Sequence, residues 1–151
     1  DLARIVAQAL AVLDADIQLR RAAVKVEVSV PPVRAEPTFL AQILCNLLSN
    51  AIKFTQPGID PLVRIHAERR DGRARLSVTD NGIGIPPAER ERIFKPFERL
   101  HGIEAYPGTG IGLAIVRKAV ERMNGAVGVE SRPGAGSQFW IELPLAKDES
   151  A

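Results

Sequence analysis

Two asparagines stand four residues apart in the stretch NLLSNAIKF, which runs from Asn46 to Phe54. The run around them is apolar and lacks glycine and proline, so it predicts a helix, although each asparagine costs about 0.5–0.7 kcal/mol of helix propensity relative to alanine. On a helical wheel one narrow polar stripe lies beside a broad apolar face, and it contains Gln42, Asn46, Asn50 and Lys53. Amide oxygens can join a magnesium shell and a lysine can reach phosphate, so the stripe predicts one wall of a nucleotide pocket. The alternative is a solvated face, although charged residues usually fill such faces.

An acidic residue ends a predicted strand in the stretch RLSVTDNGIGIP. Leu76, Val78 and Asp80 share one face of that strand, so the carboxylate should point toward the core side at the strand's end. Gly82 and Gly84 follow, and glycine lets a ligand approach the backbone closely. An inward carboxylate without a paired lysine suits an amine donor on a ligand. The alternative is that Asp80 only closes a turn, because Asp-Asn-Gly is good turn chemistry.

A second glycine-rich stretch, GTGIGLAIV, begins at Gly108 and opens another predicted helix. Glycines before a helix leave backbone N–H groups free for phosphate, and the helix dipole favours the anion. The spacing is neither the dinucleotide-binding fingerprint nor a Walker A motif. The alternative is a helix N-cap at Thr109, with glycines that permit close packing.

The segment between the two glycine-rich stretches, residues 87–106, contains Phe94, Phe97 and Tyr106 among several charges. A segment of this length between two such motifs is typical of a lid, and we expect it to be the most mobile region without nucleotide. Arg99 within it is a candidate phosphate contact. A charged surface loop is the alternative.

Composition indicates an ordinary globular protein. The 151 residues suit one domain, residues 1–151, and a net charge of +2 is too small to argue for nucleic acid as a partner. The single cysteine, Cys45, cannot form an intrachain disulfide, which favours a reducing compartment. No apolar run approaches the ~18–20 residues that span a bilayer. The chain opens directly into helical periodicity, so we expect a piece of a longer protein.

Hydrophobic periodicity predicts the elements that must position these residues. Helices are expected over residues 2–13, 37–54 and 109–125, and a short one over 87–94. Gly125 is expected to end the third of the long helices. Strands are expected over residues 24–30, 62–69, 73–80, 126–131 and 137–143. Hairpins between most strands imply an antiparallel or mixed sheet rather than a doubly wound parallel one. Three helices on one face of that sheet give a two-layer α/β sandwich.

In this order, the stretches resemble the ATP-binding catalytic domain of sensor histidine kinases, in the GHKL ATPase superfamily. NLLSNAIKF is similar to the asparagine box, DNGIGIP and GTGIGL to the two glycine boxes, and FKPF to the phenylalanine box. The closing GVESRPGAGSQFWIELP is also similar to that family's end, and FERLHGIEAYPGTGIGLAI to phytochrome-type kinases in particular. The resemblance covers nearly the whole chain. It implies the Bergerat fold, a mixed β-sheet covered on one face by three helices, with an ATP lid.

The resemblance implies a role for each matching residue at the phosphate end. Asn50 would ligate Mg²⁺, with Asn46 supporting the same metal site. Lys53 would contact phosphate, and Arg99 matches the basic position of the lid. One residue departs from the family pattern. Glu36 stands where an aspartate often caps the helix, and glutamate is a poorer cap.

The resemblance also implies how the nucleoside is held. Asp80 would accept a hydrogen bond from the adenine amino group, Phe54 would line the nucleoside side, and Ile85 and Leu113 would flank the base. The glycines would shape the adenine wall and position the phosphates. The complete set of expected nucleotide-binding residues is Phe54, Asp80, Gly82, Gly84, Ile85, Gly108, Thr109, Gly110, Ile111, Gly112 and Leu113.

The implied function is that of a histidine protein kinase module in two-component signalling. It would bind Mg-ATP and donate the γ-phosphate to a histidine on a separate dimerisation and phosphoacceptor domain of the same kinase, which then serves a response regulator. That domain is expected to be absent from this chain, since neither His66 nor His101 is followed by a carboxylate and both read as surface histidines. We expect a monomeric, cytoplasmic chain, either on its own or as the cytoplasmic part of a membrane-bound sensor. Alone, it should bind ATP without autophosphorylation.

Three other functions stay open. ATP-driven machines of the topoisomerase or mismatch-repair type place a glutamate four residues before the magnesium asparagine, and Asn46 stands there in this chain. A neutral amide cannot act as that general base, which disfavours hydrolysis. An anti-sigma-type serine kinase shares the fold, although KFT and the long FKPF lid argue against it. The third is a non-catalytic nucleotide-sensing module.

Overall fold

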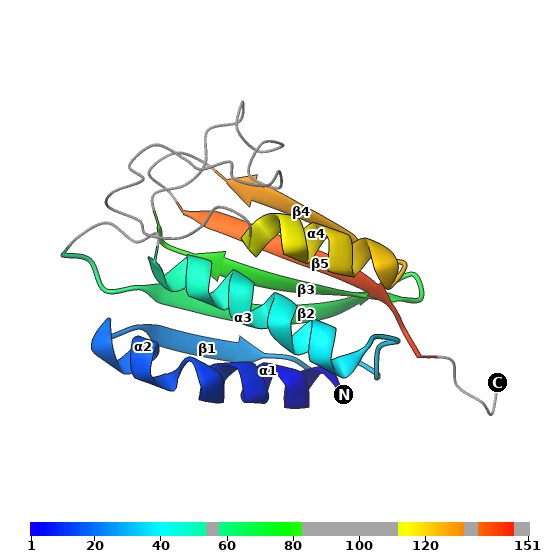
Figure 1. The fold of residues 1–151 in the computed structure, drawn as a ribbon, viewed down its shortest axis with the longest axis horizontal. Coiled ribbons are helices and arrows are strands. Elements are labelled where there is room, and N and C mark those ends of the chain that lie inside the picture. Colours follow the sequence, from blue (N-terminus) through cyan, green and yellow to red (C-terminus); the bar gives the residue numbers. More distant parts are fainter. Residues whose placement is uncertain (54–57, 83–111, 132–135, 147–151) are drawn as a thin grey trace.

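The computed structural model of the chain describes residues 1–53, 58–82, 112–131 and 136–146. Figure 1 shows the arrangement of the helices and strands in these ranges. In chain order they are α1 (Leu2–Val12), α2 (Asp14–Leu19), β1 (Ala23–Glu27), α3 (Pro37–Lys53), β2 (Leu62–Arg70), β3 (Arg73–Asp80), α4 (Gly112–Arg122), β4 (Ala126–Ser131) and β5 (Ser137–Pro144).

The strands form one mixed sheet in the order β1-β2-β3-β5-β4. The pairing of β1 with β2 is parallel, and the other three pairings are antiparallel. Helices α1, α3 and α4 lie side by side over one face of this sheet (Figure 1). The predicted two-layer sandwich with one helical layer is therefore confirmed. No helix in the described ranges is long and apolar enough to cross a membrane.

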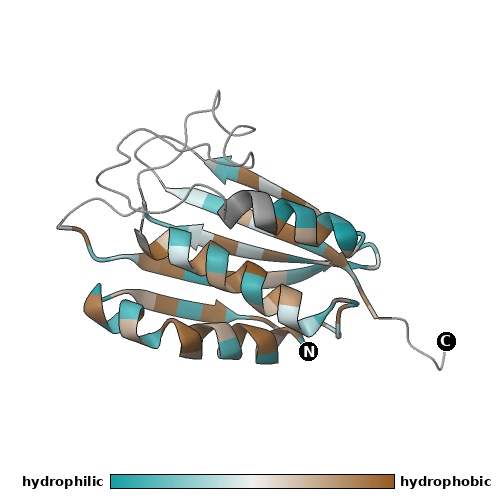
Figure 2. Ribbon diagram, viewed as in Figure 1, coloured by the Kyte–Doolittle hydropathy of each residue, from teal (hydrophilic) through white to brown (hydrophobic). Residues whose placement is uncertain are grey.

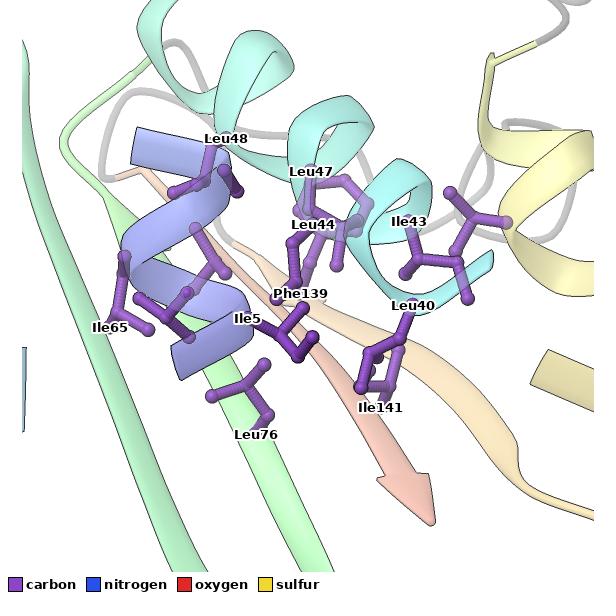
Figure 3. Close-up of a cluster of buried hydrophobic side chains, with 14 of the residues drawn as sticks. Ile5, Leu40, Ile43, Leu44, Leu47, Leu48, Ile65, Leu76, Phe139 and Ile141 are labelled. Atoms are coloured by element: carbon purple, nitrogen blue, oxygen red, sulfur yellow. The ribbon is translucent and has the colours of Figure 1, made fainter. Parts of the chain in front are cut away.

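The core fills the space between the helices and the sheet. Figure 2 shows apolar and polar residues interspersed along the helices and strands, and nearly all of the buried residues are apolar. Burying each such side chain is worth about 1.5–3 kcal/mol relative to leaving it exposed. Figure 3 shows part of this cluster, in which the labelled residues are Ile5, Leu40, Ile43, Leu44, Leu47, Leu48, Ile65, Leu76, Phe139 and Ile141.

The element boundaries differ from prediction in three places. The first helix ends at Val12, and the short helix α2, which was not predicted, follows it. Strand β1 ends at Glu27 rather than Val30, because the chain leaves the sheet edge and crosses until Val33 bridges to Leu145. Helix α4 ends near the predicted stop, but Asn124 rather than Gly125 takes the left-handed conformation, with a φ of 60°.

The face of the sheet away from the helices is covered by polar and charged side chains. Arg75 lies 3.9 Å from the centroid of the Trp140 ring and forms an ion pair of 3.2 Å with Glu142. The ring lies against Gly128 of β4, where a Cβ would overlap it. A cation stacked on tryptophan stabilises modestly, about 0.5–1 kcal/mol at an exposed site, so this cluster makes a small contribution to the stability of the outer face.

Candidate nucleotide site

Helix α3 begins with a carboxylate cap and runs unbroken toward the candidate site. Glu36 Oε2 accepts a hydrogen bond of 2.8 Å from the backbone N–H of Phe39, and Pro37 occupies the first turn. The glutamate was predicted to be the poorer cap, yet its longer side chain still reaches the helix amide. The asparagines at positions 46 and 50 consequently lie in the last turns of a regular helix.

The faces of α3 agree with the predicted stripe. Asn46 and Asn50 are half-buried and Gln42 is exposed. In the part of the chain that the structure describes, neither asparagine side chain has a hydrogen-bond partner. The apolar face is broader than predicted because Leu48 lies beside α1 (Figure 3). The buried residues of the helix are Leu40, Ile43, Leu44, Leu47, Leu48, Ala51 and Ile52.

Asp80 is the last residue of β3 and pairs with Val63 of β2 and Ser137 of β5. Its carboxylate is half-buried, and Oδ1 accepts two hydrogen bonds, from the N–H of Gly82 at 2.8 Å and from the N–H of Ser137 at 3.2 Å. Among the described residues Oδ2 has no donor. Among the described residues, backbone N–H groups therefore hold one oxygen of the carboxylate, and none donates to the other.

Burial raises the pKa of Asp80 to about 6, and the backbone N–H groups of Gly82 and Ser137 oppose that rise only in part. No cationic side chain in the described ranges lowers it. A carboxylate that is expensive to ionise without a partner gains most from a new donor. A perturbed carboxyl group at a recessed strand end is typical of a binding site.

Three residues of this site were missed by the sequence analysis, and the first is Asn81. Its Oδ1 accepts from the N–H of Leu62 at 2.8 Å, and its Nδ2 donates to the carbonyl oxygen of Asp60 at 3.2 Å. Asn81 therefore joins the start of β2 to the turn that follows Asp80. The sequence analysis gave Asn81 no role of its own, and no local pattern could reveal partners 19 and 21 positions away.

The other two missed residues are Gly136 and Ser137, at the start of β5. Ser137 is buried and opens the strand, and Gly136 precedes it with a φ of 86°. Both were predicted only as parts of a turn and a strand. Their position beside Asp80 follows from the pairing of β3 with β5, which no local sequence pattern indicates.

Many of the predicted nucleotide-binding residues fall outside the described ranges. They are Phe54, Gly84, Ile85, Arg99, Gly108, Thr109, Gly110 and Ile111, and the predicted lid and short helix lie there as well. Lys53, Gly112 and Leu113 are placed by their backbone alone: the first ends α3, and the other two open α4. Their predicted roles stay predictions.

The described parts of the predicted motifs meet at one end of the molecule. The ends of α3 and β3 and the beginnings of α4 and β5 all lie at the left of Figure 1. This end carries the side-chain amides of Asn46 and Asn50, the carboxylate of Asp80 and the start of α4. Such a set can accept hydrogen bonds from a base, coordinate a hard cation and attract an anion. In the described ranges no group of three or more His, Cys, Asp and Glu side chains could hold a metal ion.

The chain is similar to known proteins over most of its length. Residues 35–147 match the family model described as histidine kinase-, DNA gyrase B- and HSP90-like ATPase. It is 50% identical over 122 residues to the sensor histidine kinase AruS of Pseudomonas aeruginosa, covering 75% of this chain and 12% of AruS. It is 41% identical over 145 residues to the phytochrome-like protein Cph1 of Synechocystis, covering 96% of this chain and 19% of Cph1.

A solved structure gives the same result. The crystal structure of the histidine kinase ThkA in complex with the response regulator protein TrrA has a TM-score of 0.78 and 28% identity, covering 97% of this chain and 41% of that one. The chain spans less than a fifth of the length of AruS and Cph1. A phytochrome-like protein and a sensor kinase that is not named as one both match, so the phytochrome-type subfamily stays a prediction.

Proposed function

The chain belongs to the family of histidine kinase-, DNA gyrase B- and HSP90-like ATPases, as a histidine kinase ATP-binding domain, and on that premise we propose how it works. It binds Mg-ATP and donates the γ-phosphate to a histidine on a separate dimerisation and phosphoacceptor domain of the same kinase. A response regulator then receives the phosphate. Residues 1–151 act as a single nucleotide-binding domain in this scheme.

The observation that carries the proposal is the state of Asp80. One oxygen of its half-buried carboxylate is held by two backbone N–H groups, and the other has no donor in the described part of the chain. An ionised carboxylate only accepts hydrogen bonds, and the exocyclic amino group of adenine only donates them. Guanine offers a carbonyl at the matching edge, which would repel the carboxylate. Asp80 therefore selects adenine.

The magnesium ion and the phosphates belong at the end of α3. Asn50 and Asn46 are half-buried amides with no partner among the described residues, and amide oxygens fit the hard Mg²⁺ ion. Bound there, the ion would neutralise charge on the phosphates during transfer. Lys53, one turn beyond Asn50, contacts a phosphate, and Arg99 contributes a second cation. Phe54, Ile85 and Leu113 line the base, while the glycines approach the phosphates.

The transfer needs a partner domain, because neither histidine of this chain is followed by the carboxylate that is typical of a phosphoacceptor histidine. The acceptor domain belongs to the same kinase, and the downstream partner is a response regulator, the class of protein that ThkA binds. The free thiol of Cys45 and the need for ATP suit the cytoplasm, either for the whole protein or for the cytoplasmic part of a membrane-bound sensor.

Phosphate transfer in a reconstituted reaction tests the proposal. The chain is mixed with Mg-ATP labelled at the γ-phosphate and with phosphoacceptor domains of sensor kinases, and acid-labile, alkali-stable label on a histidine is measured. We expect label on an acceptor domain and none on the chain itself. Rapid release of free phosphate by the chain alone would instead identify a hydrolytic machine. Nucleotide binding with no transfer to any acceptor domain would favour a nucleotide sensor, and label on a serine would indicate a serine kinase.

A pair of variants on α3 controls this experiment. Asn50→Ala removes the proposed magnesium ligand, and Gln42→Ala removes an exposed amide two turns earlier on the same helix. We expect Asn50→Ala to abolish magnesium-dependent ATP binding and transfer while the fold is retained, and Gln42→Ala to leave both intact. Calorimetry with and without Mg²⁺ measures this. Equal magnesium dependence in Asn50→Ala and the unchanged chain would contradict the assignment.

A further inference from the structure

The backbone of β5 begins directly against the backbone of Asp80. Ser137 pairs with Asp80 in the register of the sheet, and its N–H donates to Asp80 Oδ1 at 3.2 Å. Gly136 comes immediately before and is buried. This contact reaches the carboxylate from the β5 side, while Gly82 reaches it from its own turn.

Gly136 is the point of closest approach. A Cβ on this residue would overlap the carbonyl oxygen of Asp80, and it would lie 3.1 Å from the carbonyl carbon of Asp80 and 3.2 Å from Cα of Asn81. All three are backbone atoms, so no flexible side chain could swing aside to make room. The φ of 86° also places Gly136 in the left-handed region that glycine adopts most readily.

A side chain at this position would act directly on the carboxylate. To admit a methyl group, the start of β5 and the peptide between Asp80 and Asn81 would have to separate. The Ser137 N–H would then move away from Oδ1, and the carboxylate would turn toward whatever donor remained.

We propose that Gly136 is a positioning residue for the adenine-binding carboxylate of Asp80. Its missing side chain lets β5 lie against the Asp80 backbone, aims the Ser137 N–H at Oδ1, and so leaves Oδ2 directed at the ligand. The inference rests on the proposed function in one respect, which is that Asp80 is the acceptor for the base.

Gly72 supplies a matched control for a test by Gly136→Ala. Its φ is 78°, so alanine suffers nearly the same backbone strain at both positions, but a Cβ on Gly72 would meet no atom within 4 Å. Affinities for ATP and GTP are measured by calorimetry at a temperature where both variants are folded. We expect Gly136→Ala to lower the affinity for ATP about ten-fold or more and to reduce the ratio of ATP affinity to GTP affinity. Gly72→Ala should change the ATP affinity and this ratio by less than about two-fold.

A double variant separates positioning from general weakening. In an Asp80→Asn background the carboxylate is already gone, so Gly136→Ala should weaken ATP by no more than about two-fold further. An equal loss in both backgrounds, or unchanged affinity and selectivity in Gly136→Ala alone, would overturn the proposal. If the unchanged chain bound no ATP at all, the proposed function would fail first, and that result is visible before any variant is made.

A measurement on the unchanged chain covers the case in which Gly136→Ala does not fold. The carboxyl carbon of Asp80 and the amide of Ser137 are followed by NMR as the pH is varied. We expect the Ser137 amide shift to titrate together with the Asp80 carboxyl group, because that N–H is held against Oδ1. A Ser137 amide that does not follow Asp80 would overturn the inference.

Discussion

The two ends of β3 carry similar residues and differ in what surrounds them. Asp71-Gly72 precedes the strand, and Asp80-Asn81-Gly82 follows it. At the first end both residues have positive φ, 46° and 78°, and both are exposed. At the second end Asp80 is half-buried between β2 and β5, and its carboxylate is held by two backbone N–H groups.

Turn chemistry alone does not identify a site. Aspartate and glycine serve a hairpin at one end because they tolerate left-handed backbone. At the other end the same residue types lie among strand and helix ends, where burial raises the pKa of Asp80 to about 6. Neighbours, and not residue types, separate the turn aspartate Asp71 from Asp80, the aspartate proposed to bind the base.

The largest effect is expected when each of the two aspartates is replaced by asparagine in a separate variant. Asp80→Asn should weaken ATP about ten- to hundred-fold and reduce discrimination against GTP, because a hydrogen bond to a charged acceptor is worth about 1.5–3 kcal/mol. Asp71→Asn should change neither, since asparagine serves a left-handed turn position equally well. Titration of ATP and GTP into the three proteins measures this. Equal affinities in the unchanged chain and Asp80→Asn would reduce Asp80 to a turn residue.

The pH dependence of binding sharpens the same comparison. Only the ionised carboxylate accepts freely, so with a pKa of about 6 the affinity for ATP should fall about ten-fold between pH 7 and pH 5. Phosphate groups of the nucleotide titrate in the same range, with a second pKa near ~6, so Asp80→Asn serves as the reference. The difference between the two curves should show the loss. Parallel curves would mean that Asp80 does not bind the base.

The unfolding free energy of the nucleotide-free protein should fall as the pH rises, whereas the affinity for ATP should increase. The pKa of Asp80 is raised from its ordinary 3.8 to about 6, so the folded chain holds a proton that the unfolded chain loses. The stabilising contribution is therefore present at low pH and disappears as pH rises from about 4 to about 6. Thermal unfolding of Asp80→Asn should lack this fall, and at neutral pH the variant should be the more stable protein.

A smaller effect is expected at Asn81, the residue that follows Asp80. Asn81→Ala removes the hydrogen bonds to Leu62 and Asp60, so we expect a loss of about 1–2 kcal/mol in unfolding free energy and about a three-fold loss of ATP affinity. Hydrogen exchange at the Leu62 amide should become faster. Gln138→Ala is the control, because it removes one 3.2 Å hydrogen bond to Thr79 on the outer face of the same sheet end. An equal loss of ATP affinity in both variants would contradict a specific contribution of the Asn81 hydrogen bonds to ATP binding.

The smallest effect on binding is expected from the outer face of the sheet. A Cβ on Gly128 would overlap the ring of Trp140, so Gly128→Ala should lower the unfolding free energy by about 1–3 kcal/mol and displace the ring from Arg75. Affinity for ATP should stay within about two-fold. Trp140 is the single tryptophan, so its emission reports the displacement directly. A loss of ATP affinity as large as that of Gly136→Ala would mean that any tight glycine in this sheet disturbs the site.

Much of the fold could be predicted because periodicity is local. The helix 37–54 and the hairpin around Asp71-Gly72 agree with the structure over the described residues, since burial of one face demands a repeat of 3.6 or 2. Boundaries were less accurate where the chain leaves an element for a tertiary reason. The strand predicted through Val30 stops at Glu27 because the following segment crosses to bridge Leu145, far along the chain.

The candidate site divides in the same way. The sequence predicted that the asparagines at positions 46 and 50 lie on a polar stripe and that Asp80 ends a strand on its core side, because both follow from the geometry of one element. The position of Gly136 against the Asp80 backbone, the hydrogen bond from Ser137 to that carboxylate and the hydrogen bonds of Asn81 at the start of β2 come from the tertiary structure alone. These contacts join residues 19 to 57 positions apart, and they arise from the pairing of β3 with β2 and β5. Strand pairing depends on how distant segments share one core, so a sequence pattern confined to one segment carries no record of it.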